Sequence, residues 1–146
     1  MAVGMIGIES NYATQGVEAT YTTTSTTMVF TGTGVVFTPV TSGNVKISLS
    51  SECNNDTALD GINVNIVYAA GTALTAAGTA TAGTAILSSP LTLTETTASD
   101  NRFLGLNNFV LTGLTPKTSY TFQPTIEAVT GGTASFTQYN ITVEEL

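Results

Sequence analysis

The alternation of apolar and polar residues along the chain predicts a series of β-strands. In residues 45–50 every second residue is apolar, and the same period of two recurs in residues 62–68. Because successive side chains of a strand point to opposite faces, each of these segments would bury one face and expose the other. Residues 120–128 and 133–143 also read as strands, and the Gly131-Gly132 pair between them predicts a tight hairpin.

Shorter strand-like segments fill most of the remaining chain. They occur at residues 21–30, 35–40, 91–94 and 103–111. Turn residues separate the strands at intervals of about 8–12 residues, and no segment shows the apolar period of an amphipathic helix over three turns. Roughly eight or nine short strands spaced in this way are typical of an all-β protein, and we expect an antiparallel β-sandwich of the jelly-roll kind.

Three segments depart from this regular pattern. Residues 1–19 have no clean period and contain three glycines, so we interpret them as an N-terminal arm or first edge strand, with residues 20–146 forming a single β-sandwich domain. Residues 69–89 are a low-complexity Ala/Gly/Thr tract whose frequent glycines disfavour a helix, which predicts a long loop or a flat edge hairpin. Residues 51–57 are rich in Asn and Asp, which predicts a loop.

The amino-acid composition agrees with the strand pattern and excludes some classes of binding partner. The 146 residues suit one domain and include 30 threonines, which favour strands. Ten carboxylates outnumber three basic residues, giving a net charge of −7 that excludes nucleic acids and anionic membranes as partners. No apolar run reaches the roughly 18 residues of a membrane span, and the N-terminus lacks the basic region of a secretory signal. We therefore expect a soluble protein made in a cytoplasm.

The chain lacks the residues on which many enzymatic mechanisms depend. It contains no histidine, the commonest general base, and one cysteine, Cys53, so neither a Cys-His pair nor an intrachain disulfide is available. No phosphate-binding loop is present, and no spacing singles out a pair of carboxylates for glycoside hydrolysis. We expect a protein that is not an enzyme and holds no cofactor, in which Cys53 is a small buried hydrophobe.

Two groups of side chains are candidates for binding. Glu52, Asp56 and Asp60 offer, with Asn54 and Asn55, the hard oxygen ligands that calcium prefers, although Asx-rich turns without a metal explain the same residues. Six aromatic residues at strand spacing form either the core or a subunit interface, or else a platform for sugars. They are Phe103, Phe109, Tyr120, Phe122, Phe136 and Tyr139.

The C-terminal third resembles a known group of proteins. The segment Thr112-Gly-Leu-Thr-Pro-Lys-Thr-Ser-Tyr-Thr-Phe122, followed by Ala128-Val-Thr-Gly-Gly-Thr-Ala-Ser135 and a strand ending in Glu-Glu-Leu146, resembles the C-terminal part of jelly-roll domains in tailed-bacteriophage virion proteins. The N-terminal segments 21–27, 35–43 and 45–49 are similar to the opening strands of these domains. The group is related in shape to the trimeric heads of tumour necrosis factor and complement proteins.

This resemblance implies an assembly and a role. It implies a homotrimer that decorates or cements the exterior of a phage capsid, with the major capsid protein as its partner. The N-terminal arm is then the expected capsid contact, through Met1, Val3, Met5, Ile6, Ile8 and Tyr12. The alternative role is the receptor-binding head of a tail or head fibre, using loops at residues 51–60 or 69–90. The absence of a long fibrous segment before the domain favours decoration.

The segment Leu114-Thr-Pro-Lys-Thr-Ser-Tyr120 resembles a second family as well. It is similar to the tyrosine corner of fibronectin type III domains, in which a tyrosine hydroxyl bonds to the backbone a few residues upstream. An immunoglobulin- or fibronectin-III-like sandwich is therefore the alternative fold. Against it, the chain exceeds one such domain of roughly 100 residues and has no tryptophan.

Overall fold

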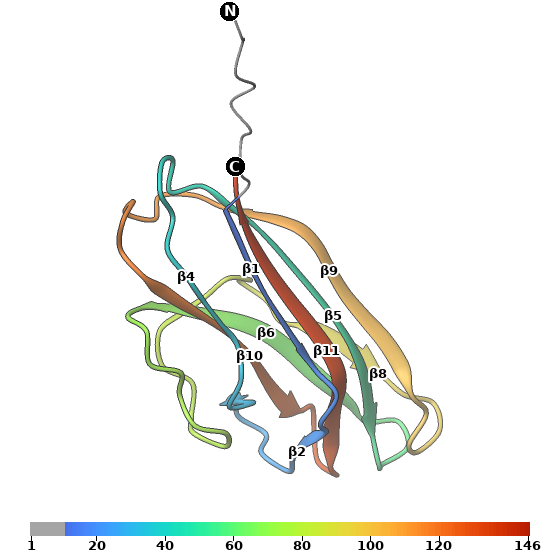
Figure 1. The fold of residues 1–146 in the computed structure, drawn as a ribbon. Helices are drawn as coiled ribbons and strands as arrows, with labels where there is room; N and C mark the ends of the chain where they lie inside the picture. Colours follow the sequence, from blue (N-terminus) through green and yellow to red (C-terminus); the bar gives the residue numbers. More distant parts are fainter. Residues whose placement is uncertain (1–10) are drawn as a thin grey trace, which may run out of the picture.

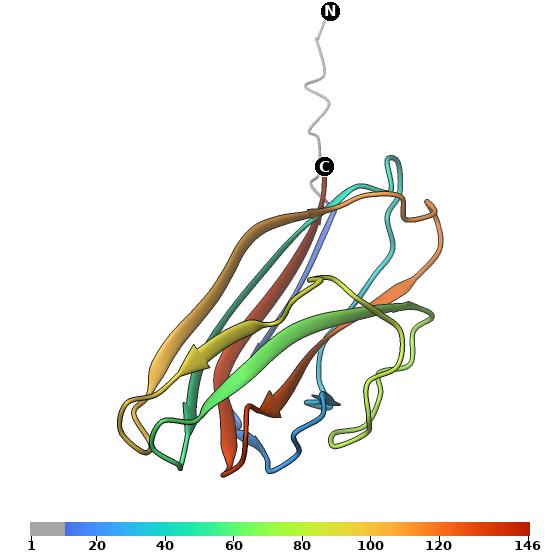
Figure 2. The ribbon, with the colours of Figure 1, turned by 180° about the vertical axis from the view of Figure 1, so that it is seen from behind.

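The computed structural model describes residues 11–146 as two packed antiparallel sheets without a helix, which confirms the predicted all-β sandwich (Figures 1 and 2). Sheet A has the strand order β1-β11-β5-β9, with β2 beside β11. Sheet B has the order β3-β10-β6-β7, with β4 beside β10 and β8 beside β6. The strands are β1 (Tyr12–Val17), β2 (Tyr21–Thr23), β3 (Val29–Phe30), β4 (Val35–Phe37), β5 (Val45–Asn55), β6 (Gly61–Ala70), β7 (Thr84–Ala85), β8 (Leu91–Thr94), β9 (Arg102–Leu111), β10 (Tyr120–Ala128) and β11 (Ala134–Glu145).

The chain visits the two sheets in the order of a jelly roll. Because β1 and β2 both flank β11, and β3 and β4 both flank β10, each pair acts as one interrupted strand, as do β7 and β8 beside β6. The eight resulting positions follow the order 1-8-3-6 in sheet A and 2-7-4-5 in sheet B, which is the double Greek key of a jelly roll. The immunoglobulin-like alternative is wrong, because it places the first two strands side by side in one sheet.

Strands that follow one another in the sequence mostly lie in different sheets, and this corrects two predictions. Residues 21–30 are not one strand, since β2 belongs to sheet A and β3 to sheet B. The turn at Gly131-Gly132 is not a hairpin, because β10 pairs with β6 whereas β11 pairs with β5. The turn therefore arches from one sheet to the other. A pair of flexible glycines permits either path, and the partners of the flanking strands decide between them.

The loop predicted at residues 51–57 is mostly strand. Strand β5 continues to Asn55, and Ser51, Cys53 and Asn55 are buried while the residues between them are half-exposed. Cys53 is 1% exposed, as predicted for a small buried hydrophobe, and burial raises the pKa of its thiol to about 11. Residues 51–55 are polar because they lie at the end of the sandwich, where side chains such as Asn55 bond to neighbouring loops. They do not form a loop themselves.

The core lies between the inner faces of the two sheets. It contains the alternating apolar residues that the sequence predicts in residues 45–50, 62–68 and 120–128. Phe122 and Phe136 are fully buried, and the ring centroid of Phe136 lies 4.7 Å from that of Tyr139. The core interpretation is confirmed for five of the six aromatic residues and wrong for Phe103, whose side chain is 84% exposed on β9.

The Ala/Gly/Thr tract lies along one end of sheet B (Figure 2). After β6 it crosses β10 and reaches β3, where Ala80 pairs with Val29, and it then returns to β6 as β7. We call residues 72–82 of this excursion the strap. The outward side chains of Gln123 and Thr125 on β10 are buried beside it. The tract is thus a long loop, as predicted, but one that is packed against the domain and reaches the edge strand β3.

Candidate functional site

The start of β1 and the C-terminus meet at one end of the sandwich (Figure 1). Strand β1 is an edge strand of sheet A and pairs with the last residues of β11. The side-chain amide of Asn11 donates a hydrogen bond to the carbonyl of Thr38 (2.8 Å), and the amide of Glu145 donates one to the carbonyl of Asn11 (2.9 Å). These bonds fix the point at which residues 1–10 join the domain. We call this point the arm root.

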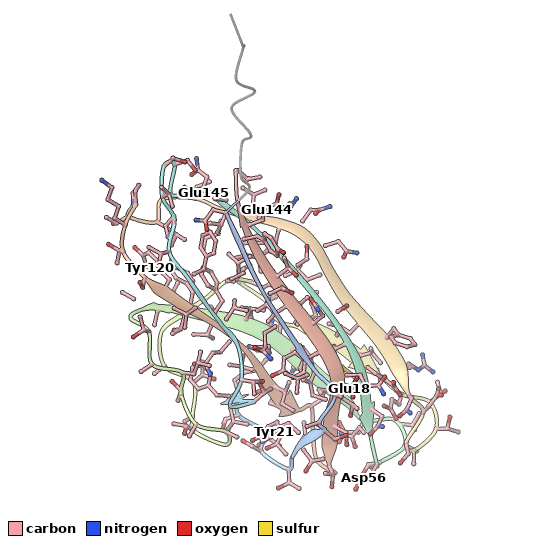
Figure 3. All side chains as sticks on the ribbon, viewed as in Figure 1. Glu18, Tyr21, Asp56, Tyr120, Glu144 and Glu145 are labelled. Carbon is pink, nitrogen blue, oxygen red and sulfur yellow. The ribbon has the colours of Figure 1, made fainter. Side chains whose placement is uncertain are left out.

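The carboxylate of Glu145 organises the arm root (Figure 3). It accepts hydrogen bonds from the consecutive backbone amides of Val40 (2.8 Å), Thr41 (2.7 Å) and Ser42 (2.8 Å), and from the side chain of Asn11 (3.3 Å). Successive amides of a turn form a concave site for an anion, and here the anion comes from the chain itself. Although partial burial opposes ionisation, these donors lower the pKa of Glu145 to about 2.

Exposed apolar side chains surround this polar centre. Tyr12, Val40 and Leu146 are 63%, 54% and 56% exposed. Leu146 is held by a bond from its amide to the carbonyl of Asn44 (2.9 Å). Of the predicted capsid contacts, Tyr12 therefore lies at the arm root, whereas Met1, Val3, Met5, Ile6 and Ile8 lie outside the described residues. No local pattern in the sequence distinguishes Glu145, because its partners lie about a hundred residues away.

Replacing Glu145 by glutamine is expected to destabilise the domain by about 1–2 kcal/mol at neutral pH, because a neutral amide accepts weaker hydrogen bonds than a carboxylate. The pKa of Glu145 is lower in the folded chain than in the unfolded chain. Its contribution is therefore complete above the ordinary pKa of 4.5 and disappears as the pH falls towards about 2. Urea unfolding of both proteins from pH 7 to pH 2 measures this.

The matched control for this prediction is Glu144→Gln. Glu144 is the neighbouring residue, and it pairs with Lys46 at 2.6 Å on the half-exposed outer face of sheet A. Exposed ion pairs contribute little, so a change below about 0.5 kcal/mol is expected. Equal losses in the two variants, or a difference from the parent protein that persists at pH 2, would contradict the assigned role of Glu145.

The predicted calcium ligands lie at the opposite end and are not brought together. Glu52 lies on the outer face of β5, opposite Thr137 and Phe103. The carboxylate of Asp56 accepts a bond from the amide of Thr133 (2.7 Å), which ties two loops together. Residues 11–146 contain no group of three or more acidic or thiol side chains placed to hold a metal ion. The calcium site stays a prediction, and the described contacts assign Asp56 and Asp60 to loop closure.

Asp60 is the most buried of these acids, at 3% exposure. Its Oδ1 accepts hydrogen bonds from the amides of Gly61 (2.8 Å) and Thr130 (2.9 Å), so that it links the β5–β6 loop to the β10–β11 turn. Burial favours the neutral acid, but the backbone donors outweigh it and lower the pKa of Asp60. Figure 3 shows Asp56 of the same loop at this end.

A fully buried carboxylate that sequence analysis missed lies beside this loop. Glu95 accepts bonds from the amides of Asn55 (2.5 Å) and Asp100 (3.2 Å), and its own amide donates to the carbonyl of Asp60 (2.8 Å). It joins the β8–β9 loop to the β5–β6 loop. The only signal in the sequence is a single acid within the threonine-rich segment 92–97.

Two further features lie outside these two ends or beside them. A shallow hollow at the edge of sheet A is lined by residues 16–18 and 138–140, where the pairing of β11 with β5 is interrupted by a bulge. The hydroxyl of Tyr120 accepts a bond from the amide of Thr115 (3.0 Å), so the tyrosine-corner contact is present although the fold is a jelly roll. No helix long and apolar enough to cross a membrane occurs in residues 11–146.

Comparison with known proteins identifies the fold. No protein-family model and no curated sequence matches the chain. Solved capsid structures of infectious bursal disease virus do match over 94% of the chain. Its derived T=1 particle has a TM-score of 0.58 at 8% identity, its VP2 subviral particle 0.55 at 8%, and its Gt strain 0.51 at 11%. The chain spans about a third of these capsid chains, at 32%, 33% and 33%. The likeness shows a β-sandwich that viral capsid chains also contain.

Proposed function

We propose that this protein is a structural subunit of a virus particle, and specifically a homotrimeric decoration protein that cements the exterior of a phage capsid. The observation that carries the proposal is the likeness of the described fold to part of chains that form viral particles. The resemblance of residues 112–135 to jelly rolls of phage virion proteins supports the choice of a phage. In this proposal the chain catalyses no reaction, and it is made in the host cytoplasm before it joins the virion.

The arm root is the surface on which contact with the major capsid protein is proposed. Tyr12, Val40 and Leu146 present apolar side chains there, and the adjoining residues 1–10 are largely apolar as well. Interface cores are enriched in aromatic and other apolar side chains, and Tyr12, Val40 and Leu146 offer such side chains at this end. The Glu145 carboxylate bonds Asn11 at the root to β11. Because β11 lies between β1 and β5 in sheet A, a partner bound at the root is held by the body of the domain.

Binding of the protein to capsids that lack it tests the proposal. Replacing Tyr12 by serine removes an aromatic anchor and is expected to weaken binding at least about tenfold, because such anchors carry most of the energy of an interface. The matched control is Leu59→Ser, a comparably exposed residue (79%) in the loop at the opposite end, which is expected to bind like the parent protein. Cosedimentation with capsids measures both affinities.

Three outcomes would contradict this function. Sedimentation of the free protein as a monomer at micromolar concentration would contradict the trimer. Capsids that resist heat and chelators equally well with and without the protein would contradict cementing, because contacts that exist only in the assembled state must stabilise it. Binding to host cells but not to capsids would indicate the fibre-head alternative instead.

A further inference from the structure

The strap is an arm attached to the domain by flexible glycines at both of its ends. It leaves sheet B after Ala70 of β6 and returns to the neighbouring part of the same strand, where Thr84 pairs with Tyr68. Gly71 and Gly83 bracket it with φ angles of 126° and 111°, a region that favours glycine. No atom lies within 4 Å of the Cβ position of Gly71. A Cβ atom on Gly83, in contrast, would lie 2.9 Å from the carbonyl oxygen of Tyr68, so this end of the strap is packed on β6. The two ends therefore lie close together beside β6, and the end at Gly71 is the open, hinge-like one.

Backbone hydrogen bonds dock the far part of the strap on β3. The amide of Phe30 donates to the carbonyl of Thr79 (3.0 Å), the amide of Gly78 to the carbonyl of Phe30 (2.9 Å), and the amide of Thr81 to the carbonyl of Met28 (3.1 Å). These are the bonds with which a β-sheet accepts one more strand at its edge. The strap thus occupies the edge of sheet B.

The side chain of Gln123 holds the middle of the strap. Its Oε1 accepts a bond from the amide of Thr75 (2.8 Å), and its Nε2 donates one to the carbonyl of the same residue (3.0 Å). Phe30, Val67 and Gln123 are each 2% exposed in this face of sheet B. The strap itself buries little, since all its residues are exposed except Thr75. An element with few buried apolar side chains of its own opens locally at a lower free energy than the whole domain unfolds.

The part of sheet B beneath the strap fits the small residues of the strap closely. A Cβ atom on Gly32, which has a φ angle of 86°, would lie 2.8 Å from the Cβ of Ala77, so close contact requires glycine on the sheet and a small residue on the strap. An opened strap leaves an unpaired sheet edge at β3, where the amide and carbonyl of Phe30 lose their partners. The occupant that restores every one of these contacts is the strap of a second copy.

We propose that the strap is exchanged between copies of this protein, so that residues 72–82 of one chain lie across sheet B of its neighbour. Exchange of an identical element is a low-cost route to assembly, because the contacts made in trans repeat those made within one chain. Gly71 is the open hinge for this change, Gly83 keeps its packing on β6, and a neighbouring copy supplies the second sheet. The proposal rests on the self-assembly included in the proposed function, but it requires no contact with a capsid.

Cross-linking between chains with different single cysteines tests the exchange. Val29 and Ala80 face each other, and the bonds from the amides of Phe30 and Thr81 lie on either side of them. Such a non-hydrogen-bonded pair has Cα atoms about 4.5 Å apart, within the range of a disulfide. Val29→Cys and Ala80→Cys chains are mixed, refolded together at high concentration and oxidised. We expect covalent dimers of one chain of each kind, several-fold above a mixture of Ala80→Cys with the parent protein.

Two matched samples make the result decisive. The double variant Val29→Cys/Ala80→Cys must form the intrachain disulfide at low concentration, which shows that the geometry permits the bond. The mixture of Val67→Cys with Ala85→Cys must not cross-link, because β7 lies beyond the hinge and stays with its own β6. Cys53 is buried in all samples.

An intrachain disulfide in the double variant without interchain dimers in the Val29→Cys and Ala80→Cys mixture would overturn the exchange. Cross-linking of the control mixture to the same extent would overturn it too, because larger parts of the fold would then be exchanging. A protein that remains monomeric at every concentration contradicts both the exchange and the trimer. Failure to bind capsids, with cross-linking intact, contradicts the capsid role alone.

Discussion

Replacing Gly43 by alanine is expected to destabilise the domain by about 4 kcal/mol and to lower its melting temperature by about 10 °C. Gly43 lies in the β4–β5 loop, beside the amides that hold Glu145, and has a φ angle of 66°. A Cβ atom there would lie 1.9 Å from the carbonyl oxygen of Leu114. The carbonyl of Gly43 itself accepts a bond from the amide of Leu114 (3.0 Å), so neither backbone moves without breaking that contact.

The matched control is Gly113→Ala. Gly113 has a comparable φ angle of 85°, but no atom lies within 4 Å of its Cβ position. Its substitution therefore adds only the strain of a left-handed alanine, about 1 kcal/mol. Thermal and urea unfolding of both variants measure the difference. Equal losses would show that the close approach of Gly43 to Leu114 contributes nothing, and that conformational strain explains both.

Replacing Asp60 by alanine is the second large expected effect, with a loss of about 2–3 kcal/mol. The substitution leaves the amides of Gly61 and Thr130 without their acceptor. Gly61 is buried, and an unsatisfied buried donor costs the full penalty of its desolvation. Because Asp60 links the β5–β6 loop to the β10–β11 turn, hydrogen exchange should accelerate in residues 56–61 and 129–133 together. Urea unfolding and exchange measured residue by residue check both parts.

Asp56→Asn is the control for this loop. Asp56 is exposed, and an asparagine keeps a carbonyl oxygen that accepts the bond from the amide of Thr133. The loss should be clearly smaller than that of Asp60→Ala, because the exposed amide of Thr133 keeps an acceptor and can also bond to water. An Asp60→Ala variant as stable as Asp56→Asn would refute the anchoring role of Asp60. The pKa of Asp60 is lowered in the folded state, so its contribution declines on acidification below the ordinary pKa of 3.8.

The candidate site was only partly predictable from residue types. Tyr12 was singled out as a contact residue and lies exposed at the arm root. Glu145, which holds that root, looked like an ordinary acid at the end of a strand, because its donors at residues 40–42 are remote in sequence. Asp60 was proposed as a metal ligand from its neighbours in the sequence. Its role in loop closure depends on Thr130, which no local pattern connects to it.

The sequence by itself determined the class of the fold and the composition of its core. A period of two in residues 45–50 and 62–68 allows one buried face only if these segments are strands, and their apolar residues do form the core. The chain has few charged residues and many threonines, so its sheets have outer faces that are polar but largely uncharged. These properties are local, because they follow from the backbone geometry of a few adjacent residues.

Only the tertiary structure decided which strands pair and what covers the sheets. The glycines at 131 and 132 suit a hairpin as well as an arch, and the arch forms because β10 pairs with β6 in one sheet and β11 pairs with β5 in the other. The Ala/Gly/Thr tract has no pattern of its own, and its place over sheet B depends on Gln123 and the edge of β3. Strand pairing depends on residues that are distant in the sequence. A period of two shows only which side chains share one face of a strand, and not which strand lies beside it.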